Sequence, residues 1–261
     1  MPLSNHMSNF ATTFSDISVM IKRNLLRYQR LPKLIIFSFI QPVMFVLLFA
    51  YVFGGAIQTG STTYIQYLLP GILVQTVLFG SMMTGVGLAE DMTKGIIDRF
   101  RSLPMARSAV LASRTITEAL RNVFMFWLMT ITGFFIGFRI EHSIFNFLIA
   151  MIITVLFAFA FSWVSATVGL TIKNVETAEI AGFIWVFPLT FASSIFVPVK
   201  TMVPAVRTFA THNPVSYTVN TVRALSLGTP VGNDLWYSLA WILGILIVFV
   251  PLAIYQYRKI S

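Results

Sequence analysis

Residues 144–170 read IFNFLIAMIITVLFAFAFSWVSATVGL, and this run contains no Asp, Glu, Lys, Arg or His. A helix of about 20 residues crosses the hydrocarbon core of a bilayer, which is about 30 Å thick. The run is apolar throughout and does not alternate with polar residues, so it is typical of a membrane-spanning helix and not of a barrel strand. Its length also allows for a tilt or an interfacial turn. This stretch predicts an all-α membrane protein.

The composition of the whole chain agrees with this prediction. Of the 261 residues, 57% are hydrophobic and 10% are charged, whereas a soluble domain carries about 25% charged residues. A soluble core of this size could not bury so much apolar surface, so the composition excludes an ordinary cytosolic enzyme and a disordered chain. Since the chain has no Cys, disulfides, thiolate metal sites and a Cys nucleophile are also excluded.

Five further apolar runs flank residues 144–170 and complete a single transmembrane domain over residues 34–257. The six predicted transmembrane helices cover residues 34–53, 67–89, 121–138, 144–170, 181–197 and 235–257. The third run is short for a span, so its helix is expected to begin further upstream, near Thr117. The sequence thus predicts a polytopic all-α protein with six spans.

Basic residues are distributed unequally between the two sides of this domain. Fourteen of the 18 Lys and Arg residues precede the first span, follow the last span, or lie after the second and fourth spans, including the start of the third. The other four lie in the connections after the third and fifth spans. Because cytoplasmic segments are enriched in Lys and Arg, both termini are predicted to be cytoplasmic. The net charge of +9 then reflects topology, and no nucleic-acid partner is expected.

The N-terminal segment is predicted to lie on the membrane surface. Residues 1–13 form a polar tail that lacks the pattern of a signal peptide. Over residues 14–33, Ile17, Met20 and Ile21 share one helical face. Basic residues fill the opposite face: Lys22, Arg23, Arg27 and Arg30. Such a helix sits among anionic headgroups, either as a simple anchor or as a lever that also touches a cytoplasmic partner. At the other end, residues 258–261 form a short cytoplasmic tail.

The connection after the second span is the longest predicted cytoplasmic connection. Its apolar residues recur at helical spacing: Ile96, Ile97, Phe100 and Leu103. Pro104 ends this pattern, so a short amphipathic helix over residues 94–104 is predicted. It is either a solvated interfacial helix or a docking helix whose apolar stripe fits a groove on a second protein.

The segment before the last span contains external helices. Asn213-Pro214 combines a capping residue with proline at the first helical position, and Gly228 and Pro230 are stop signals. A helix over residues 214–227 is therefore predicted. A second kinked apolar stretch lies between Pro198 and Pro204. These pieces are expected to dip into the outer half of the membrane or to cap a cavity there.

Several chemistries have no support in the predicted spans. No ionisable residue lies in the middle of a span, so proton-coupled transport and a charged channel are disfavoured. The chain also lacks metal-ligand spacing, a GxxxxGK[ST] phosphate loop and a GxSxG elbow. The close acidic pairs, Glu90 with Asp91 and Glu176 with Glu179, have no ligand-like neighbour, which disfavours a membrane-embedded enzyme. Any active work therefore requires energy from another subunit.

Small residues recur at helical spacing within the spans. These stripes comprise Ser81, Gly85 and Ala89; Ala158, Ser162 and Ala166; and the GxxxG of Gly133 and Gly137. Such residues let helices approach closely in lipid. The pattern predicts close packing within the chain, and a dimer interface is the alternative.

Two stretches resemble a known family. They are EDMTKGIIDRFRSLPMARSAVLASRT at 90–115 and FPLTFASSIFVPVKTMVPAVRTFATHNPVSYTVNTVRALSLG at 187–228. With the order of elements, the patterns R-F-x-S-L-P-x-x-R and N-P-V-S-Y-x-x-x-x-x-R-A-L resemble the ABC-2 type permeases, nearest to the daunorubicin-resistance branch of bacterial exporters. The resemblance covers nearly the whole chain.

The resemblance implies a complex in the bacterial plasma membrane. Two permease chains, like or unlike, would pair with two separate ATPase chains, which hold ATP and Mg, so that this chain needs no cofactor. Closure of the ATPase pair would rock the permeases between inward-open and outward-open states. The implied ATPase-coupling residues are Glu90, Asp91, Lys94, Ile97, Asp98, Arg99, Phe100, Arg101, Lys22, Arg23 and Arg27. Residues 94–104 would then form the coupling helix.

The cargo is less well defined by the sequence. The resembled family exports amphiphilic drugs, lipids and lipid-linked glycans. The 25 Phe residues suit an apolar or aromatic cargo, although Phe also faces lipid and fills helix contacts. Polar candidates for the pathway are Gln41, Gln75, Thr76, Ser162, Ser165, Thr190, Ser193 and Ser194. The rival functions are a lipid-modifying enzyme in the membrane and a non-transporting scaffold or immunity protein.

Overall fold

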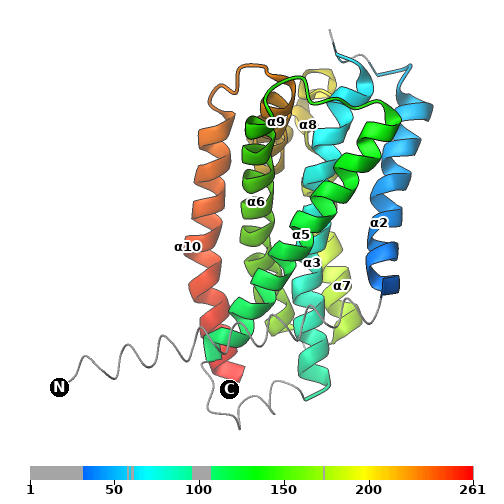
Figure 1. Ribbon diagram of the computed structural model, residues 1–261. Helices are drawn as coiled ribbons and strands as arrows, with labels where there is room; N and C mark the ends of the chain where they lie inside the picture. The colour runs from blue at the N-terminus through cyan, green and yellow to red at the C-terminus, as the bar shows by residue number, and fades with distance from the viewer. Residues whose placement is uncertain (1–31, 58, 60–61, 96–106, 173, 261) are drawn as a thin grey trace, which may run out of the picture.

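The computed structural model describes residues 32–57, 59, 62–95, 107–172 and 174–260. All its regular elements are helices (Figure 1). They are α2 (Pro32–Leu47), the π-helical turn η1 (Leu48–Phe53), α3 (Tyr64–Thr93), α5 (Arg107–Ile136), α6 (Ile144–Thr171), α7 (Val175–Phe191), the 3-10 turn η2 (Val199–Thr201), α8 (Pro204–His212), α9 (Pro214–Leu227) and α10 (Asp234–Ile260). The predicted helix over 14–33 and residues 96–104 of the predicted coupling helix lie outside this description, apart from the start of α2.

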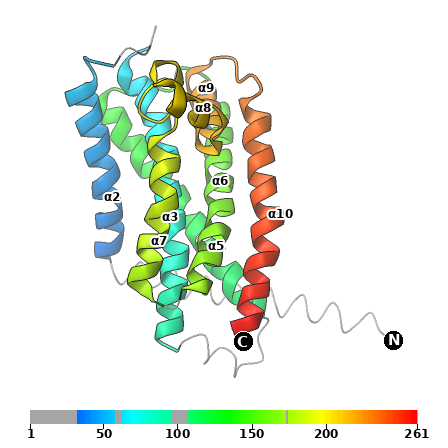
Figure 2. The ribbon, with the colours of Figure 1, turned by 180° about the vertical axis from the view of Figure 1, so that it is seen from behind.

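The long helices form an upright bundle in which neighbours along the chain alternate in direction (Figures 1 and 2). α2, α5 and α7 run one way, and α3, α6 and α10 run the other. The start of α2 and the end of α10 lie at the same end, whereas α8 and α9 lie at the opposite end. By length and composition, four of these helices could cross a membrane: α3, α5 from Ser113, α6 and α10. A shorter apolar helix covers Phe39–Phe53.

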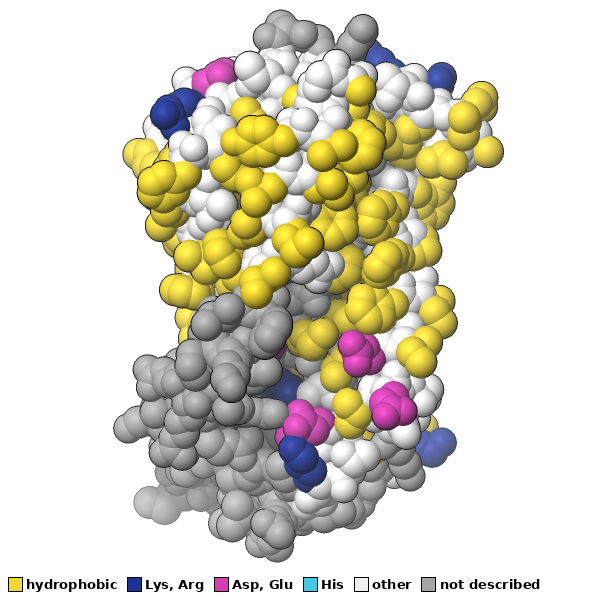
Figure 3. Space-filling view, turned by 90° about the vertical axis from the view of Figure 1, so that its right-hand side faces the viewer, with side chains coloured by type: hydrophobic (Ala, Val, Ile, Leu, Met, Phe, Trp, Pro, Cys, Tyr) yellow, Lys and Arg dark blue, Asp and Glu magenta, His cyan; other side chains and the backbone are white. Residues whose placement is uncertain are grey.

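Large apolar side chains lie on the outside of the bundle. Tyr51, Phe135, Ile184, Trp236 and Ile247 are all at least 70% exposed. On the face that carries α2, hydrophobic side chains cover the middle and upper parts, and charged side chains lie at the upper rim and near the lower end (Figure 3). An apolar belt between polar ends is the surface that a bilayer requires.

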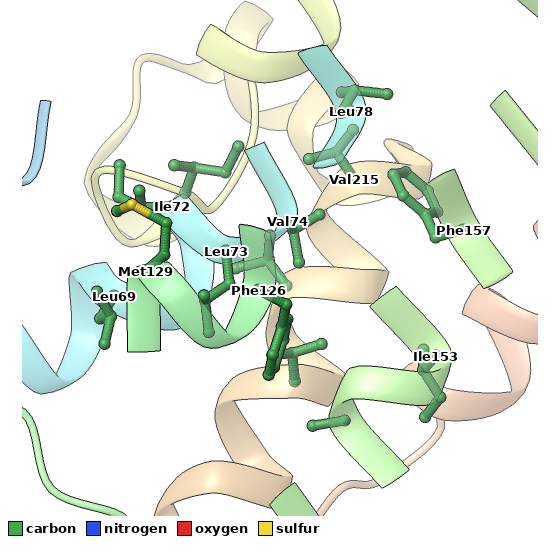
Figure 4. Close-up of a cluster of buried hydrophobic side chains, with 14 of the residues drawn as sticks. Leu69, Ile72, Leu73, Val74, Leu78, Phe126, Met129, Ile153, Phe157 and Val215 are labelled. Atoms are coloured by element: carbon green, nitrogen blue, oxygen red, sulfur yellow. The ribbon is translucent and has the colours of Figure 1, made fainter. Parts of the chain in front are cut away.

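α3 is the central helix, and most of its residues are buried. It packs against α2, α5, α6, α7 and α9. Its Leu69, Ile72 and Leu73 meet Phe126 of α5 and Phe157 of α6 in one core, and each of these side chains is fully buried (Figure 4). Because lipid is as apolar as such side chains, close packing rather than the hydrophobic effect stabilises this core.

Small residues provide close packing within the chain: Gly85 of the predicted stripes meets Ser165 and Gly169 of α6, which are not members of the predicted α6 stripe. Where α3 crosses α6, a Cβ on Gly85 would overlap the backbone of Ser165, and one on Gly169 would overlap Gly85. The Ser165 hydroxyl donates to the Met82 carbonyl (2.7 Å) and accepts from the Gly85 N–H (3.1 Å). The two glycines of the GxxxG pair differ in what they do. Gly133 packs on Leu69, whereas Gly137 lies just beyond the end of α5 with φ +110°, a backbone conformation that favours glycine.

Most helix boundaries agree with the sequence. The predicted helix over 214–227 coincides with α9, where the Asn213 side chain accepts from the Val215 N–H (2.9 Å) and Gly228 adopts a left-handed C-cap. The predicted span 144–170 coincides with α6, and α3 and α10 contain the spans 67–89 and 235–257. The stretch between Pro198 and Pro204 contains η2, and α8 begins at Pro204.

Two helices differ from their predicted ranges. α5 begins at Arg107, about four turns before the apolar run at 121–138, because its polar first half packs against α3. α7 covers Val175–Phe191 rather than 181–197. The chain turns back after Phe191, so the apolar residues Ile195 and Phe196 are buried in a turn beside α3 and not in a helix.

Candidate functional site

A pocket of about 110 Å³ lies within the bundle, between α2, α3, α5 and α7. Its walls consist mainly of phenylalanine and methionine side chains, with four polar groups. The lining residues are Gln41, Pro42, Phe45, Gln75, Thr76, Phe79, Gly80, Met82, Met83, Arg121, Met125 and Phe183. An apolar cavity with a few convergent polar groups is the usual form of a small-molecule site. Gln41, Gln75 and Thr76 were predicted from the sequence, and the structure brings these three together.

The polar groups of the pocket differ in how well they are satisfied. The Thr76 hydroxyl donates to the Ile72 carbonyl of its own helix (2.7 Å). Gln41 is exposed. Gln75 is only 4% exposed, and its Oε1 has no hydrogen-bond partner among the described residues. A buried polar atom without a partner is rare and indicates an unfilled acceptor site.

Arg121 contributes a charge to the pocket wall. Its Nε lies 2.7 Å from Oε2 of Glu118 one turn earlier on α5; Glu118 is buried, and the Arg121 side chain is 10% exposed. Glu118 and Arg121 both lie in the first half of the α5 span candidate, Ser113–Ile136, and not in its middle. The two opposite charges are buried together, which reduces the cost of placing either one in an apolar setting.

A second arginine connects α5 to α3 near the end of the bundle where α3 ends and α5 begins. Arg114 forms an ion pair with Asp91 at the end of α3. A Cβ added to Gly87 would overlap the Arg114 guanidinium, and one added to Gly80 would overlap that of Arg121. The two arginines are seven residues apart on α5, and the two glycines are seven residues apart on α3. The antiparallel helices therefore meet in register, with each arginine lying over a glycine.

Only part of the predicted coupling region is described. Glu90 forms an ion pair with Lys94 (2.5 Å), and Asp91 pairs with Arg114 as above. All three residues lie near the C-terminal end of α3, where the connection to α5 begins. The remaining predicted coupling residues lie outside the described residues: Ile97, Asp98, Arg99, Phe100, Arg101, Lys22, Arg23 and Arg27.

The other predicted pathway residues do not line the pocket. Ser162 donates to the Ala158 carbonyl (2.9 Å), Ser193 donates to the Thr190 carbonyl (2.5 Å), and Ser165 bridges α3 and α6. Ser194 donates to the Asn220 side chain (2.9 Å). Thr190 is buried, and its hydroxyl has no hydrogen-bond partner among the described residues. Four of these five hydroxyls are thus engaged in structural bonds.

A series of phenylalanine rings runs from the pocket wall along α7 and returns to the pocket wall at Phe45 of α2, and the sequence did not predict it. Phe79 and Phe183 in the pocket wall contact Phe187 at centroid distances of 5.8 and 5.3 Å. From there the contacts continue over Phe191 (5.4 Å from Phe187) to Phe196 (5.3 Å from Phe191). Phe196 in turn lies 4.4 Å from Phe49, which contacts Phe45 and Phe53. The sequence does contain a pattern that could have predicted these contacts. Phenylalanine recurs every fourth residue at positions 45, 49 and 53, and again at positions 183, 187 and 191, so each set shares one face of its helix.

The end of the bundle that carries α8 and α9 is closed by a polar network around Arg223 of α9. Its guanidinium stacks on the Tyr67 ring (3.6 Å to the centroid) and donates to the carbonyls of Tyr67 (3.0 Å) and Ser194 (2.8 Å). The Tyr64 hydroxyl donates to the Phe196 carbonyl (2.9 Å). Burial lowers the pKa of the Arg223 guanidinium from its ordinary value. Arg223 was counted from the sequence as one external cation, but it fixes α9 and the turn after α7 onto α3.

Comparisons with known proteins agree with this architecture. Residues 15–227 match the ABC-2 type transporter family. The chain is 32% identical to the daunorubicin resistance ABC transporter permease protein DrrB1 of Streptomyces coeruleorubidus, over 95% of this chain and 88% of that protein. It is 27% identical to the probable doxorubicin resistance ABC transporter permease protein DrrC of Mycobacterium tuberculosis, over 92% and 87% of the two chains. It is 26% identical to the putative transport permease ycf38 of Cyanophora paradoxa, over 85% and 79%. The chain therefore belongs to the ABC-2 type transporter family, as a multi-pass membrane permease subunit whose ATPase is a separate chain.

Proposed function

We propose that this permease forms the membrane pathway of an ATP-driven exporter that moves an amphiphilic or hydrophobic molecule, drug-like or lipid, out of the cell. The observation that carries the proposal is the Phe- and Met-walled pocket within the bundle of an ABC-2 type permease. The printed names of two relatives, which concern daunorubicin and doxorubicin resistance, support a drug-like cargo. The chain of phenylalanine rings beside the pocket gives such a cargo an apolar surface along α7.

The proposed topology has six spans with both termini in the cytoplasm. α2 with η1 and α7 would supply the two spans that are shorter than the other four. Two observations support it: the alternating direction of the six helices, and the excess of Lys and Arg in the sequence before α2, at the end of α10 and in the connections that follow α3 and α6. In this orientation α8, α9 and the Arg223 network face the outside of a bacterial plasma membrane.

ATP would act on the pathway through the opposite, cytoplasmic end. The helices predicted over 14–33 and 94–104 would contact the ATPase pair, which would bind ATP and Mg, and a second permease chain would complete the complex. Arg114 and Arg121 are placed to pass a movement of this end toward the pocket, because both lie on α5 against α3 and the second lines the pocket. Release would then require the network around Arg223 to open.

The size of the pocket implies a change of conformation during transport. Sites for drug-sized ligands measure about 300–1,000 Å³, whereas this pocket measures about 110 Å³. A whole cargo would therefore fit only after a wall moves. α2 is the best candidate for the moving wall, because it contacts α3 and α5 less extensively than the central helices contact one another. Its Phe45 contacts Phe191 of α7 at a centroid distance of 6.3 Å.

The test is transport by the permease reconstituted with its ATPase chain in proteoliposomes, with an aromatic fluorescent amphiphile as cargo. ATP-dependent accumulation is expected in the wild type. Phe79→Ala should reduce it roughly ten-fold, because this change removes ring contacts in the pocket wall. Phe135→Ala, on an 88% exposed side chain of α5, is the matched control and should transport normally. Accumulation that needs no ATP, or equal loss in both variants, would contradict the proposal.

A further inference from the structure

We infer that α8 lies on the membrane surface as a lipid-binding helix, and that its contact with anionic phospholipids stabilises the Arg223 network at this end of the bundle. The inference concerns a partner of the permease and goes beyond the proposed export of a cargo. Only the choice of the outer leaflet rests on the proposed topology. Three features of α8 carry it: an apolar stripe that the protein leaves exposed, cations with no acid near them in the sequence, and a C-cap residue that is bonded to α7 and α9.

α8 is amphipathic, and the protein covers only part of its apolar side. At about 100° per residue, Val206, Phe209 and Ala210 share one side of the helix. The opposite side is polar and consists of Arg207, Thr208, Thr211 and His212. Only Ala210 of this helix is buried, whereas Phe209 is 48% and Val206 38% exposed. Together with the N-cap residue Val203, which is 64% exposed, these two side chains form the α8 stripe.

A lipid bilayer is the partner that fits the α8 stripe. The chain belongs to a family of multi-pass membrane proteins, and α8 lies at one end of the bundle, packed on α9 (Figures 1 and 2). An amphipathic helix in this place buries its apolar side about 5–10 Å deep, at the boundary between headgroups and acyl chains. A second protein fits less well, because a stable interface buries about 800 Å² on each partner, and this stripe consists of three side chains.

The residues around the stripe favour anionic headgroups. Residues 199–212 contain Lys200, Arg207 and His212 and neither Asp nor Glu, and these three basic residues are exposed. Arg207 donates through Nη2 to the carbonyls of Lys200 and Met202, each at 2.9 Å, which fixes η2 to α8. Cations beside an apolar stripe bind the phosphate groups of anionic lipids. An anionic phospholipid surface therefore satisfies both sides of the helix.

Asn213 connects the position of α8 to the Arg223 network. It is the C-cap residue of α8 and the N-cap residue of α9, where its Oδ1 accepts from the Val215 N–H (2.9 Å). Its Nδ2 donates to the carbonyls of Leu189 and Ala192 at the end of α7, each at 2.8 Å. Arg223 lies further along α9 and holds the turn after α7 onto α3. Because one side chain joins these elements, a loss of the lipid contact of α8 should loosen the network.

Spin labels on α8 test the lipid contact, because the chain has no Cys. Val206→Cys, Phe209→Cys, Thr208→Cys and Thr211→Cys are labelled singly in the permease–ATPase complex, in nanodiscs that contain phosphatidylglycerol, without ATP. Labels at 206 and 209 should collide mainly with oxygen, which concentrates among acyl chains, and labels at 208 and 211 mainly with a water-soluble nickel chelate. Collision with nickel at all four positions would place α8 in water. Shielding of 206 and 209 from both reagents would place a second protein there. Either result overturns the inference.

The headgroup is tested by comparing nanodiscs of phosphatidylcholine with nanodiscs that contain phosphatidylglycerol. For the label at 206, the ratio of oxygen to nickel collisions should rise about two-fold with phosphatidylglycerol. Lys200→Glu should abolish this rise, since it reverses an exposed charge beside the stripe. Lys259→Glu is the matched control, because Lys259 is an exposed cation in the last turn of α10 at the other end of the bundle, and it should keep the rise. Equal ratios in the two lipids, or equal effects of the two substitutions, would overturn the preference for anionic lipid.

The effect on the network is measured with a thiol at Ile195, which is fully buried in the turn after α7. In an Ile195→Cys background, Phe209→Asp should speed the reaction with a membrane-impermeant maleimide roughly five-fold, because a charge in the stripe expels it from lipid and the turn opens more often. Thr208→Asp, on the polar side of the same helix, is the control and should leave the rate unchanged. Equal rates in these two variants would overturn the link between α8 and the network. None of these measurements uses cargo or ATP, so a failure of the proposed export would leave their outcome unchanged.

Discussion

At the scale of single residues, glycines set the distances between the central helices. Gly85 and Gly169 let the backbones of α3 and α6 touch, and Gly87 and Gly80 leave room for the guanidinium groups of α5. Ser165 then bonds across the crossing to Gly85 and Met82. In lipid, where apolar burial gives little driving force, such contacts hold the bundle together.

Gly85→Ala should destabilise the folded permease by roughly 1–3 kcal/mol, because the added Cβ overlaps the Ser165 backbone, which cannot rotate away. The measurement is thermal unfolding of the detergent-solubilised protein. Gly244→Ala is the control: a Cβ there meets no atom within 4 Å, so the better helix propensity of alanine should leave stability unchanged or slightly raised. Equal melting temperatures for the two variants would contradict the close crossing.

The residue-level prediction from the sequence succeeded where the chemistry is local. Asn213 and Gly228 predict the two ends of α9, because asparagine is favoured as an N-cap and glycine as a C-cap. The role of Arg223 was not predictable, because its acceptors lie on Tyr67 and Ser194, far away in the sequence. Gln75 was predicted as a pathway residue by its polarity alone, but its unpartnered oxygen emerges only from the packing around it.

At the scale of elements, the pair α3 and α5 connects one end of the bundle to the pocket. The sequence placed the start of the third span near residues 117–121, because hydropathy falls where charged residues appear. In the structure the helix begins at Arg107, because Arg114 forms an ion pair with Asp91 of α3 and Arg121 forms an ion pair with Glu118. A hydropathy profile scores each charged residue separately. It therefore does not predict that two opposite charges can pair inside the bundle and continue a helix there.

Exchanging the charges of the Asp91–Arg114 pair tests this connection. Asp91→Arg and Arg114→Asp should each reduce cargo-stimulated ATP hydrolysis of the permease–ATPase complex by roughly two- to thirty-fold. The double exchange should recover part of the loss, because the ion pair between α3 and α5 is restored. The readout is the ratio of stimulated to basal hydrolysis.

A control at the same end of the bundle separates this pair from general charge effects. Glu176→Gln changes an exposed acid in the first turn of α7 and should leave the ratio unchanged. If the double exchange behaves as the sum of its two single variants, the pair does not couple the helices, and the proposed route from the cytoplasmic end to the pocket is wrong.

At the scale of the whole molecule, the two ends have different constructions. One end carries the ion pairs of Asp91 and Glu90 and the connection between α3 and α5. The other is closed by α8, α9 and the Arg223 network. The pocket lies between them and is too small for a whole drug-sized cargo. Transport by such a molecule requires the two ends to open at different times, which is why their assignment to the two sides of the membrane matters.

That assignment can be tested directly, because the chain has no cysteine and a single introduced thiol gives no background. Lys200→Cys and Glu176→Cys place exposed thiols at opposite ends of the bundle. With the proposed topology, a membrane-impermeant maleimide should label Lys200→Cys in intact cells, and Glu176→Cys only after the membrane is permeabilised. The reverse pattern would invert the topology. It would place the Arg223 network in the cytoplasm and require the ATPase to act at the end that carries α9.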